Sequence, residues 1–369
     1  MNRICFILPW FIKDAIGGSE LAAYNIAKEL LSRGWEVFYI CEDRSAKKYD
    51  QYEGIKISRM PDRRWYSKGL NYWSLKKRMY EIKADYWYCR SSSIYLYPVM
   101  VERIARKSGG KTIWALRSNS DAEIHKNRNS LLKEQVPTKF IQSILNKNIP
   151  KIPVILVQNN EQQNGLKENY NSNANIIYNG HPVPGLTEVD SRKRENIILW
   201  VGHLRPGKRP ELFVSLAKRD LSNSIQYKMI ASGNELEITQ FVENSAQKLP
   251  QLEFLGERPV EDVNQLLLRA RALVTTSESE GFPNTHIQAW MRGVPVVSTG
   301  IDPDDLIKKQ GLGIIASSID ELHDAIQKLV IDEIYWNKVS QRCRNFSVTN
   351  FDIRRTVDSF IDIITEPIL

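Results

Sequence analysis

Short apolar runs alternate with longer amphipathic stretches along the first half of the chain. The short runs predict β-strands, and stretches with the roughly 3.6-residue period of apolar side chains predict helices. The expected strands are Arg3–Pro9, Glu36–Cys41, Ile55–Arg59, Tyr86–Cys89, Thr112–Leu116, Val154–Val157 and Asn175–Tyr178, and the expected helices are Ser19–Ser32, Ile94–Lys107 and Leu131–Lys147. This alternation predicts a parallel sheet with helices on both faces.

The alternation stops and then begins again. Residues 181–196 are rich in Pro, Gly and charged side chains and predict a linker. The elements expected beyond it are Ile197–Val201, Tyr227–Ala231, Leu273–Thr276 and Pro295–Ser298 as strands, and Arg209–Arg219, Leu236–Lys248, Val260–Arg269, Asn284–Arg292 and Ile319–Val330 as helices. We therefore expect two α/β domains, residues 1–180 and 197–350, followed by a C-terminal segment, 351–369, that contains a helix over Phe351–Ile364.

Length and composition agree with this division. A chain of 369 residues, with 42% apolar and 25% charged side chains, suits two globular domains. No run approaches the roughly 20 apolar residues of a membrane helix. The longest candidate, Ile4–Ile12, is interrupted by Pro9 and has no small-residue cleavage site, so we do not expect a signal peptide. The four cysteines are far apart, which predicts buried thiols and no disulfide frame or metal site.

The positive charge lies in the first half of the chain. Residues 1–180 hold 29 Lys and Arg against 17 Asp and Glu, whereas the remainder holds 22 against 26. Such asymmetry indicates an anionic partner that meets one half, although a plain solvated basic face is the alternative. The sequence has no zinc-finger spacing or RNA-binding aromatic motif, so we expect no nucleic acid. The stretch Arg59–Arg78 instead mixes cations with aromatic residues as membrane-surface segments do, and its expected membrane-facing residues are Arg63, Arg64, Trp65, Trp73, Lys76 and Lys77.

Two loops after expected strands carry groups that suit a phosphate. Gly17 and Gly18 follow the first strand and open a helix, where glycine lets a ligand approach the backbone and the helix start attracts anions. A plain tight turn is the alternative. The stretch WVGHLRPGKRP, residues 200–210, places His203, Arg205, Lys208 and Arg209 between a strand and a helix. Several cations there suit a diphosphate, and an exposed basic loop is the alternative.

A third stretch, TSESEGFPNTHIQAWMRGVPVV, covers residues 276–297. Glu280 lies in a Glu-Gly-Phe-Pro turn before a helix, and Gln288 lies inside that helix. A carboxylate at a helix start stabilises the helix dipole, and beside glycine at the end of a strand it can also bind sugar hydroxyls. From these residues alone, both interpretations stay open.

Together these motifs resemble family 4 retaining glycosyltransferases, the glycosyl transferases group 1, of the GT-B fold. The resemblance also rests on Tyr178-Asn179-Gly180 and on Gly293-x-Pro295-Val296-Val297, and it is most specific in the C-terminal half. It implies two Rossmann-like domains with parallel sheets facing a cleft, and a nucleotide-sugar donor held by the C-terminal domain. It also implies no metal or other cofactor, and a last helix that packs back onto the N-terminal domain.

The resemblance assigns roles to individual positions. Lys208 and Arg205 would stabilise the leaving diphosphate, and Glu280 would contact the transferred sugar. The remaining donor-binding positions would be Gly17, Gly18, His203, Gly281, Phe282, Pro283, Asn284 and Gln288. Three departures stand out: Gln288 replaces a usual Glu, His203 replaces a usual Arg, and Arg117-Ser-Asn-Ser-Asp121 replaces a region that often has His, with Asp121 as a candidate sugar contact.

The implied activity is transfer of a sugar to a glycan or lipid-linked acceptor, with retention of configuration. Basic N-terminal domains of this kind suggest bacterial cell-surface polysaccharide or lipopolysaccharide synthesis by a cytoplasmic enzyme, peripheral on the inner membrane face. A nucleotide-sugar 2-epimerase of the same fold, a non-catalytic glycan-binding relative and, from charge alone, a nucleic-acid binder are the alternatives. The sugar, the nucleotide base and the acceptor are not encoded in any motif that we recognise.

Overall fold

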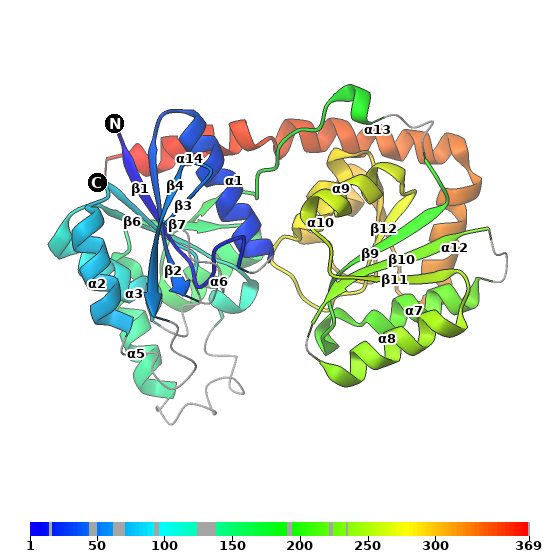
Figure 1. Cartoon of the computed structure of the whole chain (residues 1–369), viewed down its shortest axis with the longest axis horizontal. Coiled ribbons are helices and arrows are strands. Elements are labelled where there is room, and N and C mark those ends of the chain that lie inside the picture. The colour runs from blue at the N-terminus through cyan, green and yellow to red at the C-terminus, as the bar shows by residue number, and fades with distance from the viewer. Residues whose placement is uncertain are drawn as a thin grey trace. The chain divides into compact units, whose positions relative to one another are not determined.

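The chain folds into two compact units (Figure 1). The computed structural model describes residues 1–14, 17–43, 50–61, 71–91, 96–123, 138–189, 194–220, 224–233 and 235–367. Unit 1 comprises Met1–Pro182 together with Ile353–Leu369, and unit 2 comprises Val183–Asp352. The chain therefore leaves unit 1, builds the whole of unit 2, and returns.

Unit 1 is built on an eight-stranded sheet with the order β3-β4-β2-β1-β5-β6-β7-β8. The strands are β1 (Arg3–Ile7), β2 (Glu36–Asp43), β3 (Gln51–Tyr52), β4 (Ile55–Pro61), β5 (Tyr86–Cys89), β6 (Lys111–Ala115), β7 (Val154–Val157) and β8 (Asn175–Ile176). Only the short pair β3–β4 is antiparallel among the pairings of the described strands. The strand order reverses direction between β1 and β5, which makes their carboxyl ends the topological switch point of this sheet.

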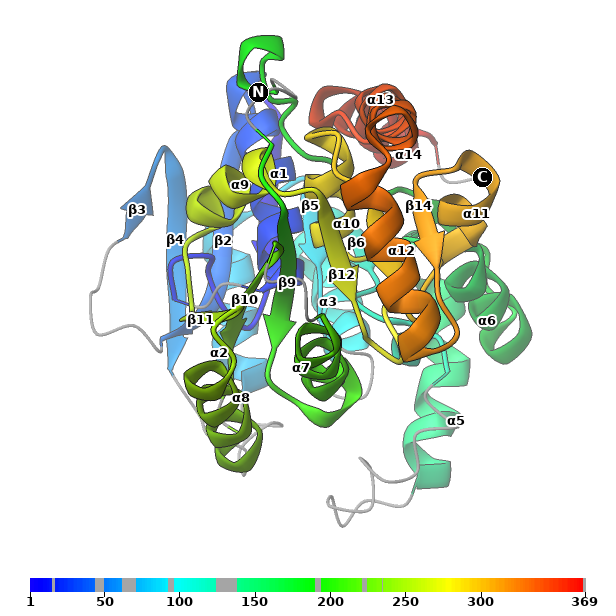
Figure 2. The same ribbon diagram turned by 90° about the vertical axis from the view of Figure 1, so that its right-hand side faces the viewer.

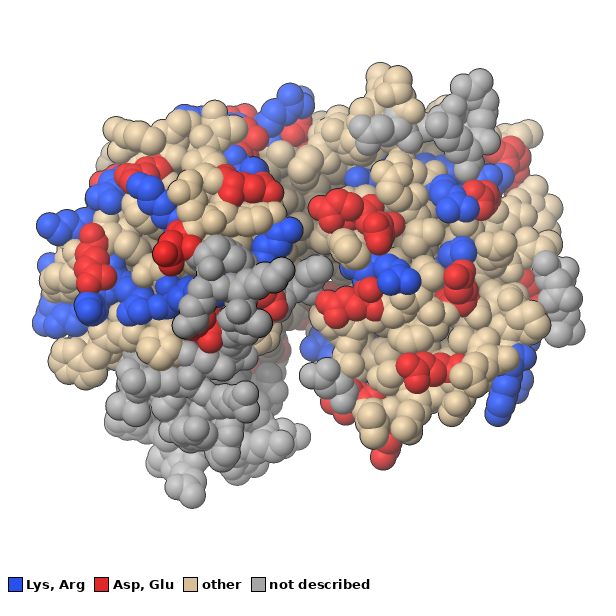
Figure 3. Space-filling view, in the orientation of Figure 1, with Lys and Arg blue, Asp and Glu red and all other residues tan. Residues whose placement is uncertain are grey.

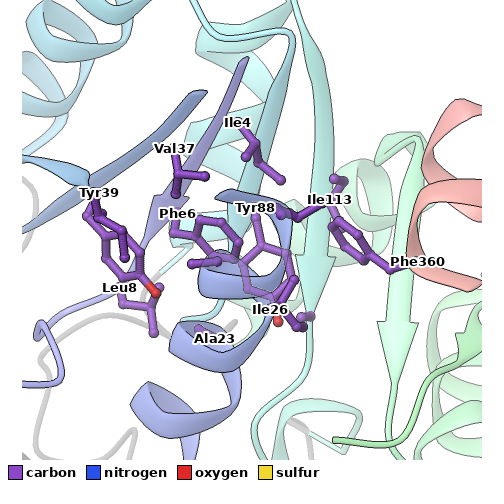
Figure 4. Packing of buried hydrophobic residues seen from close by; sticks show 14 of the residues in the cluster. Ile4, Phe6, Leu8, Ala23, Ile26, Val37, Tyr39, Tyr88, Ile113 and Phe360 are labelled. Carbon is purple, nitrogen blue, oxygen red and sulfur yellow. The ribbon is translucent and has the colours of Figure 1, made fainter. Parts of the chain in front are cut away.

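Helices cover both faces of this sheet. They are α1 (Gly18–Ser32), α2 (Asn71–Ile82), α3 (Tyr97–Ser108), α5 (Thr138–Asn148), α6 (Asn160–Tyr170) and α14 (Ile353–Thr365). Alternate residues of β1 face opposite sides, as the pleat requires. Ile4 and Phe6 join the core beneath α1 and α14, whereas Cys5 and Ile7 join the core beneath α2 and α3. Figure 4 shows the first of these cores, with Phe360 among the β-strand side chains.

Helix α14 completes the core of unit 1. Its apolar stripe buries Val357, Phe360 and Ile364 fully, and the Phe360 ring lies 6.0 Å from the ring of Tyr88. At the surface, Arg33, the residue directly after α1, pairs with Asp358 over 2.6 Å. The segment 353–365 is thus part of the first sheet's hydrophobic layer.

Unit 2 is built on a six-stranded sheet with the order β11-β10-β9-β12-β13-β14. Its strands are β9 (Ile197–His203), β10 (Gln226–Ser232), β11 (Leu252–Gly256), β12 (Ala272–Thr275), β13 (Val296–Ser298) and β14 (Gly313–Ile315). All of the described pairings are parallel. Figure 2 shows β9 between β10 and β12. Since the order reverses between β9 and β12, their carboxyl ends form the switch point where ligands of such sheets bind.

The helices of unit 2 lie on both faces of its sheet (Figure 1). They are α7 (Pro210–Arg219), α8 (Leu236–Lys248), α9 (Val260–Arg269), α10 (Asn284–Met291), α11 (Leu306–Gln310), α12 (Ile319–Ile331) and α13 (Glu333–Asn350). Apolar side chains of α7, α8 and α12 share one core with the sheet, and Trp336 at the start of α13 closes it. Helices α9 and α10 lie on the other face. This arrangement directs the N-termini of α7 and α10 toward the switch point, because each follows a strand that ends there.

The expected strands and helices are present, with ends shifted by a few residues; the first residues of the helices expected over Ile94–Lys107 and Leu131–Lys147 lie outside the described residues. Seven of the described helices and strands were not expected from the sequence: β3, α2, α6, β11, α11, β14 and α13. The residues expected to form the linker include a short 3-10 turn at Leu186–Glu188. All four cysteines are buried free thiols, as expected. None of the described helices is long and apolar enough to cross a membrane.

Candidate functional site

The loops that follow β9 and β12 lie together at the switch point of unit 2. The first contains a 3-10 turn, Pro206–Lys208, and leads into α7; the second leads into α10. The backbone N–H of Glu278 donates to the carbonyl of Gly207 over 2.9 Å. The Thr276 hydroxyl donates to the carbonyl of Lys208 over 2.6 Å and accepts from the indole N–H of Trp200 over 3.0 Å. The two loops are therefore joined through the backbone on either side of Lys208.

Lys208 and Glu280, two residues expected at the site, are in direct contact. The Lys208 ammonium forms a hydrogen-bonded ion pair with Oε1 of Glu280. Their side chains are 13% and 19% exposed, so the pair is shielded yet still reached by solvent. A cation and a carboxylate thus lie side by side between the N-termini of two helices, which is a suitable arrangement for a ligand that has both phosphate and hydroxyl groups.

Arg209 binds groups inside the protein, whereas the cations of this loop were expected to bind a diphosphate. Its backbone is left-handed, with φ of 47°, which turns its side chain away from the path of the preceding turn. The Arg209 guanidinium donates to the carbonyl of Thr276 over 2.7 Å and to the hydroxyl of Thr299 over 2.9 Å. It therefore links the loops after β9, β12 and β13, and its hydrogen-bonding capacity is largely used inside the protein.

His203 and Arg205 complete the loop. Arg205 is exposed, and its side chain makes no hydrogen bond or ion pair with any described residue. His203 shares a hydrogen bond of 2.8 Å between Nδ1 and the Ser232 hydroxyl. Partial burial, followed by the charges of Lys208 and Arg205, lowers the pKa of His203. His203 is thus largely neutral near pH 7 and cannot replace the full charge of an arginine.

The turn after β12 positions the other expected residues along α10. Gly281, Phe282 and Pro283 precede the helix, and Phe282 is buried with its ring against Phe351 at 5.5 Å. Its side chain therefore belongs to the core of unit 2. Gln288 is 4% exposed and donates to the Asn264 side-chain oxygen of α9 over 3.2 Å. Asn284, at the first position of α10, is also buried.

His286 was not expected at the site. It is fully buried on α10, and neither ring nitrogen has a hydrogen-bond partner among the described residues. Its ring meets Trp290 edge-on at 5.4 Å. Burial, reinforced by the charge of Lys208, lowers the pKa of His286 to about 3. A single histidine within a helix carries no pattern in the sequence that would have indicated this position.

In unit 1, the glycine loop precedes α1 at the switch point of the first sheet. A Cβ atom at Gly17 would lie 2.3 Å from Oε2 of Glu20, so glycine leaves room for the Glu20 carboxylate folded back over the helix start. Glu20 is buried, and its burial raises its pKa, against the opposing influence of Arg90 and Arg117. The position of the Glu20 carboxylate thus explains a glycine at residue 17 without a ligand. The close approach of a ligand, expected from the sequence, is a second explanation. Gly18 is the first residue of α1.

Asp121 is turned inward. It is 1% exposed, and its carboxylate accepts from the backbone N–H of Arg117 over 2.9 Å. This carboxylate fixes the loop after β6. The sugar contact expected of Asp121 stays a prediction.

The expected membrane-facing segment is described only in part, since Arg63, Arg64 and Trp65 lie outside the described residues. On α2, Trp73 is 68% exposed and Lys77 is exposed, while the Lys76 ammonium lies 5.1 Å from the Trp73 ring centroid. Figure 3 shows basic side chains gathered over the part of unit 1 that contains α2 and α3. Arg59, at the start of this segment, points inward and pairs with the buried Asp14 over 2.8 Å.

Residues 187–346 match the family model described as "Glycosyl transferases group 1". This part of the chain is therefore similar to glycosyltransferases of that family. The matched residues contain the whole of the loop pair described above, from His203 to Gln288. Among the described residues, no three His, Cys, Asp or Glu side chains converge as metal ligands.

Two curated relatives match this chain over part of its length. One, from Campylobacter jejuni, is named GalNAc-alpha-(1->4)-GalNAc-alpha-(1->3)-diNAcBac-PP-undecaprenol alpha-1,4-N-acetyl-D-galactosaminyltransferase; it is 28% identical over 43% of this chain and 46% of its own. The other, from Escherichia coli, is named UDP-Gal:alpha-D-GlcNAc-diphosphoundecaprenol alpha-1,3-galactosyltransferase; it is 25% identical over 48% of this chain and 47% of its own. The matches thus span about half the length of each relative.

Solved structures match this chain along its length. Anabaena HepE, in complex with UDP and glucose, has a TM-score of 0.77 with 14% identity and covers 100% of both chains. WaaG, a glycosyltransferase involved in lipopolysaccharide biosynthesis, has a TM-score of 0.75 with 16% identity and covers 99% of this chain and 100% of its own. These similarities confirm the expected GT-B fold class.

Proposed function

We propose that the protein is a retaining glycosyltransferase that moves a sugar from a nucleotide-sugar donor to a lipid-linked glycan. The observation that carries this proposal is the contact between Lys208 and Glu280 at the switch point of unit 2. In this proposal Lys208 binds the donor diphosphate, Glu280 accepts hydrogen bonds from the sugar hydroxyls, and Gln288 binds the ribose. The backbone N–H groups at the start of α10 and the exposed Arg205 add to the diphosphate site.

The proposed reaction needs stabilisation of a leaving group more than a strong base. The bond from the sugar's anomeric carbon to the phosphate oxygen breaks while negative charge builds on the diphosphate. Lys208 and Arg205 stabilise that charge, and each such contact is worth roughly 2–4 kcal/mol of barrier. The acceptor hydroxyl attacks from the face that the diphosphate leaves, and its proton passes to the departing phosphate oxygen. Cationic side chains and helix N-termini serve here in place of a metal ion, so the proposal includes no cofactor.

The names of the relatives support a lipid-linked acceptor. Both curated relatives are named for acceptors on undecaprenol through a diphosphate, and WaaG is named for lipopolysaccharide biosynthesis. We therefore propose a role in bacterial surface-glycan synthesis at the inner membrane face. The exposed Trp73 beside Lys76 and Lys77 on α2 supports contact with anionic lipid headgroups.

A panel of nucleotide sugars tests this proposal. A donor should raise the melting temperature of the protein, because a ligand that binds only the folded state stabilises it. Adding an undecaprenyl-diphosphate-linked glycan should then give a product with the donor's anomeric configuration. Nucleotide-sugar binding without transfer to any such acceptor would favour the non-catalytic relative, and interconversion of the donor at C2 would favour the epimerase. Failure of every nucleotide sugar to bind would overturn the proposal.

A further inference from the structure

The side chain of Lys208 has one ionic partner among the described residues, and that partner is Glu280. Both groups belong to the proposed donor site, where they are assigned to different parts of the ligand. While the pair persists, the Lys208 ammonium is neutralised by the protein itself. A diphosphate that approaches Lys208 therefore meets the carboxylate of Glu280 at the same place.

Hydrogen bonds to backbone atoms hold the two loops around this pair in place, whereas the Lys208 side chain is bound only to Glu280 among the described residues. Thr276 and Glu278 bind the carbonyls of Lys208 and Gly207, and Arg209 binds the carbonyl of Thr276. These contacts fix the main chain on both sides of the pair. The long Lys208 side chain makes no other hydrogen bond with a described residue, so rotation of its methylene groups is enough to separate it from Glu280 without moving either loop.

We propose that Glu280 competes with the donor diphosphate for Lys208, so that the site selects the intact nucleotide sugar over the free nucleoside diphosphate. This inference rests on the proposed function. A nucleoside diphosphate alone takes Lys208 and leaves the Glu280 carboxylate unpaired beside a second anion, which is unfavourable in a shielded site. A nucleotide sugar brings hydroxyl groups that donate to Glu280, so both members of the pair gain a new partner together.

The same exchange favours release of the product. Transfer removes the sugar from Glu280 and leaves the nucleoside diphosphate on Lys208. Among the described residues, the Lys208 ammonium is the one group that donates to the Glu280 carboxylate, and re-formation of this ion pair displaces the diphosphate. Before the reaction the ion pair thus favours binding of the nucleotide sugar, and after the reaction it favours release of the nucleoside diphosphate.

Binding measurements with Glu280→Gln test the competition. The matched control is Glu278→Gln, in the same loop, because Glu278 is exposed and its side chain has no contact with Lys208. Calorimetry with UDP, GDP and inorganic pyrophosphate compares the two variants with the wild type. Glu280→Gln should bind the preferred diphosphate about tenfold more tightly, as expected for removal of a close like charge, and Glu278→Gln should change its affinity by less than about threefold. Equal affinities in the two variants, or weaker binding to Glu280→Gln, would overturn the proposal.

A double variant separates this effect from a general change in charge. In the Lys208→Ala background, Glu280→Gln should give no gain in diphosphate affinity, because the residue that it frees is absent. A gain that persists in that background would contradict the competition. Pyrophosphate distinguishes the two proposals of function: if no nucleotide sugar binds but Glu280→Gln still gains pyrophosphate affinity that depends on Lys208, the competition stands and the glycosyltransferase assignment fails.

Discussion

The hydroxyl of Thr276 donates a hydrogen bond to the carbonyl oxygen of Lys208 and, in the same position, accepts one from the indole N–H of Trp200. Thr276 is fully buried at the end of β12, and Trp200 is buried in β9. One hydroxyl therefore joins the two strands at the switch point to the residue that we place on the donor diphosphate.

Replacing Thr276 by Val should reduce both stability and turnover. The change keeps the shape but leaves the buried Trp200 N–H without an acceptor, which costs about 1–3 kcal/mol. Urea unfolding of the full chain measures this loss. The matched control is Thr276→Ser, which keeps the hydroxyl and should lose much less; equal losses in the two variants would show that the methyl group, and not the hydroxyl, is what matters.

Lys208→Ala should lower turnover by a factor of roughly 10²–10³, because removal of one group that stabilises developing charge has an effect of this size. The fold should persist, since the Lys208 side chain is not part of a core. Steady-state assays with saturating donor measure the change. Lys309→Ala, on an exposed part of α11, is the control for loss of a lysine in the same unit. Turnover of Lys208→Ala close to that of the wild type would remove Lys208 from the mechanism.

Gln288→Ala should weaken binding of the free nucleoside diphosphate, because we assign its amide to the ribose, where it can both donate and accept. Gln288→Glu should keep most of that affinity, since a carboxylate also accepts from a diol. Calorimetry distinguishes the two. The assignment to the ribose would be wrong if Gln288→Ala bound the diphosphate as tightly as the wild type.

His286 should make the protein sensitive to mild acid. The pKa of His286 is about 3 in the folded protein, against roughly 6.5 in an unfolded chain, so the unfolded state takes up more protons between these values. The free energy of unfolding therefore falls as the pH decreases, by about 2 kcal/mol from this residue between pH 7 and pH 5. His286→Phe, which suits the site beside Trp290, should remove that part of the decrease. An identical decrease in wild type and variant, measured by urea unfolding at both pH values, would contradict this prediction.

Helix α2 should bind anionic vesicles. Changing both Lys76 and Lys77 to Gln should weaken binding by about 1 kcal/mol for each lysine, and Trp73→Ala should weaken it further. Sedimentation with anionic and neutral vesicles at low and high salt measures the effect. The control changes Lys308 and Lys309 of unit 2 to Gln and should leave binding intact. If the wild type ignores anionic vesicles at low salt, the basic face of unit 1 has another partner.

Regular patterns made most of the fold predictable from the sequence. Buried strands such as Val154–Val157 are apolar throughout, and helices such as Leu236–Lys248 lie between clear loops, so their ends were predicted correctly. Helix α6 was missed because its sequence, NEQQNGLKENY, is mostly polar, and its start depends on a cap from Asn159. Strand β11 lies at the edge of its sheet with a single buried residue, which gives no alternating pattern.

The sequence predicted which residue types belong to the candidate site. It did not predict which of these residues contact one another. Lys208 and Glu280 were both expected from their loops, but 71 residues separate them and no sequence pattern encodes their pairing. The role of Arg209 depends on a left-handed backbone and on acceptors from two other loops. Asp121 suited a sugar by chemistry alone, yet its loop uses the carboxylate internally. Side-chain direction, which the sequence does not give, decides each of these cases.

The return of the chain to unit 1 through α14 has a consequence for biosynthesis. Unit 2 is continuous in sequence, so all of its strands and helices have been synthesised before residue 353 is added. The core of unit 1 lacks Val357, Phe360 and Ile364 until that point, which leaves the apolar surface of α1 and β5 beneath them uncovered. The hydrophobic core of unit 1, which begins at the first residues of the chain, is therefore completed only after the whole of unit 2 has been synthesised.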